Sequence, residues 1–458
     1  MEKIIYNKFK SVGLVLILVF ALSSCDKWID TEINIDPDAP ADVPMNLLLP
    51  AIQQSVGYNM LGNNSVRTNN IWMQLFDGTE RQSFTEARYQ LTPADVNNLW
   101  NSMYTEMFMN SMVMINKAEL NESPHNSGVA KTMVAATLGM ATDLFGSMPF
   151  SEAFKGGENV LTPTFDSQQD IYNTIFTYLD AANSELSGSD DVGVGGDVIY
   201  NGSTSKWKKA ASSIKARHKL QLSKVNGSAA YTEALAAAGA GFTSNADDME
   251  VPFESANKNP IYQFMDERGD IRMNKTLLDM LEAQDDPRIP FYYAQDDDGE
   301  YTGSAPGSEN ANASQPGTHV ASEDSPTVIM SYAELKFIEA ECHFMLGATA
   351  NAQAAYEAAV AASVLKVTGS ANTAWLDANI NGDPVTLQKI IEQKYMALFA
   401  TNQPYADWRR TGFPVLELAA GAKLSEIPRR FPYGQGEITY NAANVPAVTI
   451  SDRLWWDN

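Results

Sequence analysis

The chain has 458 residues, with 32 Lys and Arg against 56 Asp and Glu, and a formal net charge of −24 at pH 7. A hydrophobic content of 44% with 19% charged residues is typical of a folded chain with a large core. The acidic excess argues against nucleic acid as a partner and against polybasic attachment to anionic lipid, because both need a basic surface.

The N-terminus has the pattern of a bacterial lipoprotein signal. Three lysines precede an apolar run over 12–22, which is shorter than the ~20 residues that a membrane-spanning helix needs. The run ends in Leu-Ser-Ser-Cys at 22–25, and small residues before a cysteine form a lipobox. We therefore expect residues 1–24 to be removed and Cys25 to carry lipid. The alternative is an ordinary secretory signal that happens to contain a cysteine.

The predicted cleavage changes both the charge and the cysteine chemistry. It removes three lysines and one glutamate, a net +2, which takes the formal charge from −24 to −26. Residues 25–45 are rich in Asp and Pro and are interpreted as an acidic tether, followed by a single domain over 46–458. No other apolar run approaches membrane length, so membrane contact is expected through the lipid anchor only. A lipidated Cys25 leaves Cys342 without a disulfide partner, as a buried thiol.

Helical periodicity dominates the rest of the chain. Its spacing predicts helices that begin near 92, 167, 206 and 383. Thr92 and Pro93 suit the cap and first position of the first helix, Ser167 suits the cap of the second, and Asp383 with Pro384 suits the start of the fourth. The fold class is therefore predicted as mainly α.

Residues 331–365 have the pattern of a tetratricopeptide (TPR) helix hairpin. Small residues let the two helices approach closely, and an aromatic residue fills the groove between them. The positions that fit this pattern are Ala340, Gly347, Ala352, Tyr356 and Ala359. Only approximate echoes occur elsewhere, so we expect a few TPR-like hairpins and not a regular solenoid.

Residues 294–326 form a long polar segment that includes a candidate calcium loop. The run at 296–300 is Asp-Asp-Asp-Gly-Glu, in which Asp296 and Asp298 are weak candidates for a structural Ca²⁺, although the EF-hand spacing does not fit. A solvated acidic turn is the alternative. The metal content is otherwise unknown from the sequence.

No familiar catalytic signature occurs in the chain. Motifs for nucleophilic serine, nucleotide binding and zinc hydrolysis are absent, and no carboxylate pair is singled out for glycoside hydrolysis. The sequence thus predicts a protein that is not an enzyme and needs no cofactor, with a surface glycosidase kept as the weaker alternative.

Aromatic and polar residues suggest sugar binding. Sugar rings present flat C–H faces to aromatic rings, while Arg, Asn and Gln bind their hydroxyls. The candidate glycan-binding residues are Trp72, Gln74, Arg81, Tyr89, Tyr292 and Tyr301, and the segment 63–104 adds Arg67, Asn69, Asn70, Gln82 and Trp100. Burial in the core is the alternative for Trp72 and Trp100. Tyr301, in a polar loop, is the candidate that packing explains least.

Several segments together resemble the SusD/RagB-like nutrient-binding outer-membrane lipoproteins, in the SusD-like subgroup. They are the lipobox with its tether, DLFGSMPFSEA at 143–153, DVIYNGSTSKW at 197–207, Asp-Pro-Arg at 286–288, the hairpin at 333–363, and IIEQKYMALFATNQPYADWRRTGFP at 390–414. The resemblance covers essentially the whole mature chain. We interpret Asp407, Trp408, Arg409 and Arg410 within the last segment as buried scaffold residues and not as a ligand site.

The resemblance implies a SusD-like fold, in which TPR-like hairpins support a loop-rich ligand-binding region. It also implies a surface-exposed, lipid-anchored protein of the outer membrane that captures glycans or oligosaccharides and delivers them to a TonB-dependent, SusC-like transporter. Capture of peptides by the same arrangement is the alternative. Ligand contacts in this family lie in variable loops, so no contact residue is carried over.

Overall fold

The computed structural model describes residues 42–458, of which Met45–Asn458 form one compact unit. The predicted signal peptide, Cys25 and most of the predicted tether lie outside the described residues, so these assignments stay predictions. Within 42–458, no helix combines the length and the apolar character needed to cross a bilayer.

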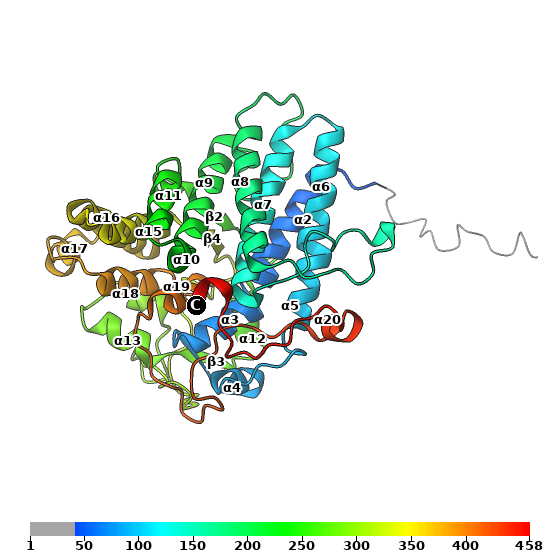
Figure 1. The fold of residues 1–458 in the computed structure, drawn as a ribbon. Helices are drawn as coiled ribbons and strands as arrows, with labels where there is room; N and C mark the ends of the chain where they lie inside the picture. The colour runs from blue at the N-terminus through cyan, green and yellow to red at the C-terminus, as the bar shows by residue number, and fades with distance from the viewer. Residues whose placement is uncertain (1–41) are drawn as a thin grey trace, which may run out of the picture. The chain divides into compact units, whose positions relative to one another are not determined.

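Helices that follow one another in the chain pack side by side (Figure 1). Helix α6 (Met109–Leu120) packs on α7 (Pro124–Phe145), α7 on α8 (Gln168–Glu185), and α8 on α9 (Thr204–Gln221). The series continues through α11 (Ser228–Ala238). Small residues allow the close approach: a Cβ on Gly139 would lie 2.1 Å from the His218 ring, so α7 and α9 meet at this glycine.

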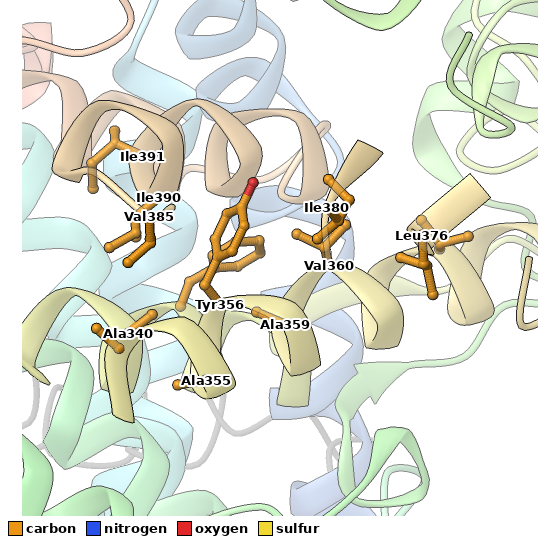
Figure 2. Close-up of a cluster of buried hydrophobic side chains, with 13 residues drawn as sticks. Ala340, Ala355, Tyr356, Ala359, Val360, Leu376, Ile380, Val385, Ile390 and Ile391 are labelled. Atoms are coloured by element: carbon orange, nitrogen blue, oxygen red, sulfur yellow. The ribbon is translucent and has the colours of Figure 1, made fainter. Parts of the chain in front are cut away.

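The predicted hairpin at 331–365 is confirmed as α15 (Tyr332–Met345) and α16 (Thr349–Thr368). Helix α18 (Leu387–Ala397) packs on both, and α17 (Thr373–Asn379) lies between α16 and α18 in the chain. Figure 2 shows the apolar cluster that joins them, in which the Tyr356 ring stands on α16 with its hydroxyl directed away from that helix. The small residues and the aromatic ring therefore have the packing role that the pattern predicts.

The remaining helices are shorter and surround this series. They are α2 (Met45–Ser55), α3 (Asn64–Trp72), α4 (Arg81–Ala87), α5 (Asn97–Ser102), α10 (Ser223–Asn226), α12 (Pro260–Glu267), α13 (Lys275–Glu282), α14 (Ile289–Tyr292), α19 (Gln403–Thr411) and α20 (Gln435–Tyr440). Two π-helical turns, Val56–Met60 and Met103–Phe108, continue α2 and α5.

Strands contribute two small antiparallel sheets. Strand β1 (Phe76–Gly78) pairs with β3 (Ile271–Met273), and β2 (Met249–Val251) pairs with β4 (Thr327–Met330). Each pairing joins segments far apart in the chain. The structure is mainly α, as predicted.

Buried ion pairs fasten the helices to each other. Arg217 on α9 lies 2.6 Å from Glu334 on α15, and Arg410 on α19 forms a two-pronged pair with Glu341 on α15. Asp407 lies 2.7 Å from Lys394 on α18. The scaffold interpretation is confirmed for Asp407, Arg409 and Arg410, which are all buried, whereas Trp408 is only partly buried. Removing one member of a buried ion pair would leave the other charged in the core.

Two predicted helix starts are wrong and two are confirmed, including the start near 206, where α9 begins at Thr204. Ser167 caps α8, because its Oγ accepts a hydrogen bond from the Asp170 backbone N–H at 3.1 Å. Thr92 is instead part of a turn that the Asp95 carboxylate closes, and α5 begins five residues later. Thr386, not Asp383, caps α18 by accepting from the Lys389 N–H.

Candidate functional site

Three of the predicted sugar-stacking rings lie in the core, which corrects that expectation. Trp72 is fully buried against Tyr405 and Phe431, and its indole N–H donates to the Glu86 carbonyl at 3.0 Å. Tyr89 and Tyr292 are also buried. A ring covered on both faces by protein has no face for a sugar, so tertiary packing decides the role of these residues.

The three other predicted glycan-binding residues, Gln74, Arg81 and Tyr301, lie in separate parts of the structure. Gln74 is buried, donates to the Glu417 carbonyl and lines a large cleft that is described below. Arg81 is exposed at the start of α4, where it pairs with Asp270 at 2.8 Å. Tyr301 is half-buried in the 294–326 segment. Binding by Tyr301 stays a prediction.

The calcium candidates form a hydrogen-bonded turn. The Asp296 carboxylate accepts from the backbone N–H groups of Asp298 and Glu300 at 3.0 Å, and from the Thr302 hydroxyl at 2.8 Å. These donors lower the pKa of Asp296. No group of three or more His, Cys, Asp or Glu side chains suited to a metal occurs among residues 42–458. Asp296 thus closes this turn through its hydrogen bonds, and calcium binding by Asp296 and Asp298 stays a prediction.

A small polar pocket lies where α3 and α4 meet the turn before α5. Its volume is about 260 Å³, and most of its lining is side-chain amide. We call it the amide pocket; it is lined by Asn59, Asn63, Asn64, Arg67, Gln82, Ala94, Asp95, Asn98 and Leu99. Amides and a guanidinium supply the donors and acceptors that bind hydroxyl-rich ligands, and no aromatic ring belongs to this lining.

Arg67 is a buried group of the amide pocket with unused hydrogen-bonding capacity. Its Nη1 donates to the Asn63 Oδ1 at 2.8 Å, one helical turn earlier on α3. The guanidinium carbon lies 3.9 Å from the centroid of the Phe264 ring on α12, a cation–π contact that fixes its plane. Its Nε is buried and has no hydrogen-bond partner within 42–458. A buried unpaired donor is costly, so an acceptor on a ligand would be favoured there.

Glu86 sets the charge behind the pocket. Burial raises the pKa of this carboxyl to about 7, and the charge of Arg67 and a hydrogen bond from Gln82 offset that effect only in part. Gln82 and Glu86 are one turn apart on α4, and the Trp72 indole holds the same turn of that helix. Burial also lowers the pKa of Arg67, with Glu86 opposing it. The charge balance of this site therefore changes near neutral pH.

The sequence pattern identifies some residues of the amide pocket and misses others. Arg67 and Gln82 stand in the polar segment that the sequence singled out, and the asparagines cluster at 59–70. Asn98 is exposed with no side-chain hydrogen bond among the described residues, and the sequence pattern does not identify it as a site residue. Phe264 was missed because almost 200 residues separate it from Arg67. No local pattern reports such a contact.

The fold and this polar pocket define a helical scaffold of the ligand-binding class. The sequence matches the family model described as SusD-like, "Starch-binding associating with outer membrane", over residues 37–434. The chain therefore belongs to the SusD-like family. The description of that family names binding and outer-membrane association, not catalysis.

Solved structures agree with this assignment. A SusD/RagB family protein from Bacteroides thetaiotaomicron is 25% identical, with a TM-score of 0.77 over 91% of this chain and 99% of that one. A chitin-binding protein is also 25% identical, with a TM-score of 0.76 over 91% and 100%. A chitin-binding SusD homolog from Flavobacterium johnsoniae shares the fold at 23% identity, with a TM-score of 0.78 over 90% and 98%. No curated protein matches the chain.

Proposed function

We propose that this chain is a non-catalytic surface lipoprotein that captures oligosaccharides in the amide pocket. The observation that carries the proposal is the buried Arg67 Nε without a partner, in a pocket lined by amides. A neutral sugar offers hydroxyl and ring oxygens as acceptors for Arg67, and hydroxyl donors for the amide oxygens. Binding is of modest affinity, because sugar hydroxyls must give up water for these partners.

Membership of the SusD-like family supports the rest of the proposal. The chain is held in the outer membrane by lipid on Cys25 and delivers its ligand to a TonB-dependent, SusC-like transporter. Chitin fragments are the first ligands to test, because a chitin-binding protein 25% identical to this chain has the same fold. Starch fragments come second, from the description of the family.

Titration calorimetry of the full-length protein in detergent tests the binding site. The ligands are N-acetylglucosamine oligomers and malto-oligosaccharides. Replacing Arg67 by Met removes donors worth about 1.5–3 kcal/mol to a ligand, so the affinity should fall roughly tenfold to a hundredfold. Asn98→Ala, on an exposed side chain, should weaken binding with little risk to folding.

Asn226→Ala is the matched control, because Asn226 is exposed on α10 and does not line the pocket. Equal affinities in all four proteins would move the glycan to another site. Binding of peptides but of no oligosaccharide would favour peptide capture, and release of products from a polysaccharide would favour the glycosidase.

Anchoring and delivery need separate measurements. Cys25→Ala should leave the chain unlabelled by an alkynyl fatty acid and should release it from the membrane fraction; labelling that persists would contradict lipidation at this cysteine. Affinity capture from solubilised membranes should recover a TonB-dependent barrel, identified by mass spectrometry. Recovery of the chain without such a barrel would count against delivery to a transporter.

A further inference from the structure

A second cleft, larger than the amide pocket, lies along the TPR-like hairpin. Its volume is about 720 Å³, within the roughly 300–1,000 Å³ range of ligand sites. Side chains from α13, α16, α17 and α18 and from the segments at 306 and 414–417 line it. It shares no lining residue with the amide pocket. We call it the α13–α18 cleft.

Tyr356 gives this cleft an unused polar group. The residue is 3% exposed, and its ring packs in the apolar cluster between the helices. Its hydroxyl makes no hydrogen bond within residues 42–458, yet Tyr356 lines the cleft. Figure 2 shows the Tyr356 ring among the other residues of the cluster, with its oxygen at the end directed away from α16. The ring is therefore held in the core while its hydroxyl, which has no protein partner among the described residues, is available to a ligand in the cleft.

The charges of the cleft favour a cation. Four carboxylate residues and two lysines line it, which gives a formal charge of −2. Lys275 pairs with Asp279, and Lys389 lies 2.5 Å from Asp383, so each lysine is neutralised by a neighbour. Glu392 and Glu417 remain without a basic partner among the described residues. Burial is the largest cause that raises the pKa of Tyr356; the charges of Asp383, Glu357 and Glu392 add to it, and the charge of Arg288 opposes it.

The walls of the cleft are fixed and partly apolar. The Gln393 amide donates to Gln284 at 2.9 Å, and Gln393 also accepts from Arg288, which pairs with Asp286 in the core. Val415, 78% exposed, stands at the edge of the cleft. Rigid amides and an open apolar side chain suit the polar edge and the C–H face of a sugar ring.

We infer that the α13–α18 cleft is a second ligand site, selective for oligosaccharides of amino sugars whose free amines carry a positive charge. The amine lies between Glu392 and the Tyr356 hydroxyl, which accepts a hydrogen bond from it. This selectivity goes beyond the proposed capture of neutral glycans, because the lining of the amide pocket has no net formal charge, whereas that of the cleft is −2. Because the two sites share no lining residue, a negative result at one site leaves the proposal for the other unaffected.

Titration of the full-length protein with a glucosamine trimer tests the inference, with the N-acetylated trimer and maltotriose as neutral comparisons. The Arg67→Met background weakens the amide pocket and isolates the cleft. The glucosamine trimer should still bind in that background, and its affinity should fall as salt is raised. Tyr356→Phe and Glu392→Gln should each reduce its affinity about tenfold, as expected for one lost hydrogen bond to a charged group.

Tyr356→Phe keeps the ring in the core and removes a hydroxyl with no protein partner, so the melting temperature should not change. Tyr301→Phe is the matched control, because Tyr301 lies outside the cleft lining. An affinity for the glucosamine trimer that is unchanged in both Tyr356→Phe and Glu392→Gln would overturn the inference. So would equal or tighter binding of the N-acetylated trimer in the Arg67→Met background. Neither result would affect the proposed role of the amide pocket.

Discussion

Glu86 is expected to make the stability of the protein depend on pH near neutrality. Its side chain is 2% exposed, and burial raises the pKa of its carboxyl to about 7 from an ordinary 4.5. A group whose pKa is higher in the folded state binds its proton more tightly there. Its contribution to stability is complete below the unfolded pKa and is lost as the pH rises through the folded pKa. The window therefore runs from about 4.5 to about 7.

The magnitude follows from the shift. A difference of 2.5 pKa units, from 4.5 to about 7, corresponds to about 3 kcal/mol at about 1.4 kcal/mol per unit. Most of it, about 2–3 kcal/mol, falls between about pH 5 and pH 8. In Glu86→Gln the residue cannot ionise, and the neutral amide keeps the size of the side chain. The variant should thus gain about 2–3 kcal/mol relative to the wild type across this range.

Urea unfolding of the two proteins at several pH values in this range measures the difference. Glu267→Gln is the control, since Glu267 is exposed at the end of α12 and its curve should run parallel to that of the wild type. If the free energies of unfolding of Glu86→Gln and the wild type ran parallel, the reasoning would be refuted. Glu86 would then be ionised in both states, and Arg67 would compensate its burial in full.

Three further predictions concern the scaffold. Gly139→Ala places a Cβ against an α9 histidine and should lower the free energy of unfolding by about 1–3 kcal/mol. Gly157→Ala is the control, because a Cβ on Gly157 meets nothing within 4 Å and should leave that free energy unchanged. Equal losses of stability in urea unfolding would contradict the close approach of α7 and α9. Arg217→Met leaves Glu334 buried without its partner and should lower the free energy of unfolding by about 3–5 kcal/mol. The double variant Arg217→Met with Glu334→Leu should recover most of that loss. A double variant no more stable than the single one would contradict this account of the buried pair. EDTA should leave the melting temperature unchanged, because protein donors occupy the Asp296 carboxylate; a fall of several degrees would support the calcium hypothesis.

The local part of the fold could be predicted because its signals are local. The small residues of the 331–365 hairpin and its Tyr356 need only the two helices that contain them, and both helices form as predicted. Ser167 likewise satisfies a backbone N–H three residues away. By contrast, the Thr92 segment has a good cap pattern, but the Asp95 side chain closes a turn there instead. A Pro after a cap residue is compatible with both outcomes.

The roles of the aromatic residues could not be predicted, because the same ring suits a core and a sugar. The role of Trp72 depends on Tyr405 and Phe431, which lie more than 300 residues away in the chain and pack against its ring. Tyr292 is likewise buried, with its hydroxyl donating to the Met396 carbonyl at 3.1 Å. The candidate site instead emerges from unsatisfied polar groups, a property that only the packed structure defines.

The two candidate sites differ in the formal charge of their linings, and this difference determines which oligosaccharides the chain can discriminate. Arg67 and Asp95 balance each other in the lining of the amide pocket, and protonation of Glu86 near neutral pH removes a negative charge behind it. The α13–α18 cleft leaves Glu392 and Glu417 as negative charges. Lowering the pH should therefore weaken the binding of an amino sugar at the amide pocket, while neutral sugars are affected little. A free amine thus directs an oligosaccharide to the cleft, and acetylation of that amine removes the charge that the cleft attracts.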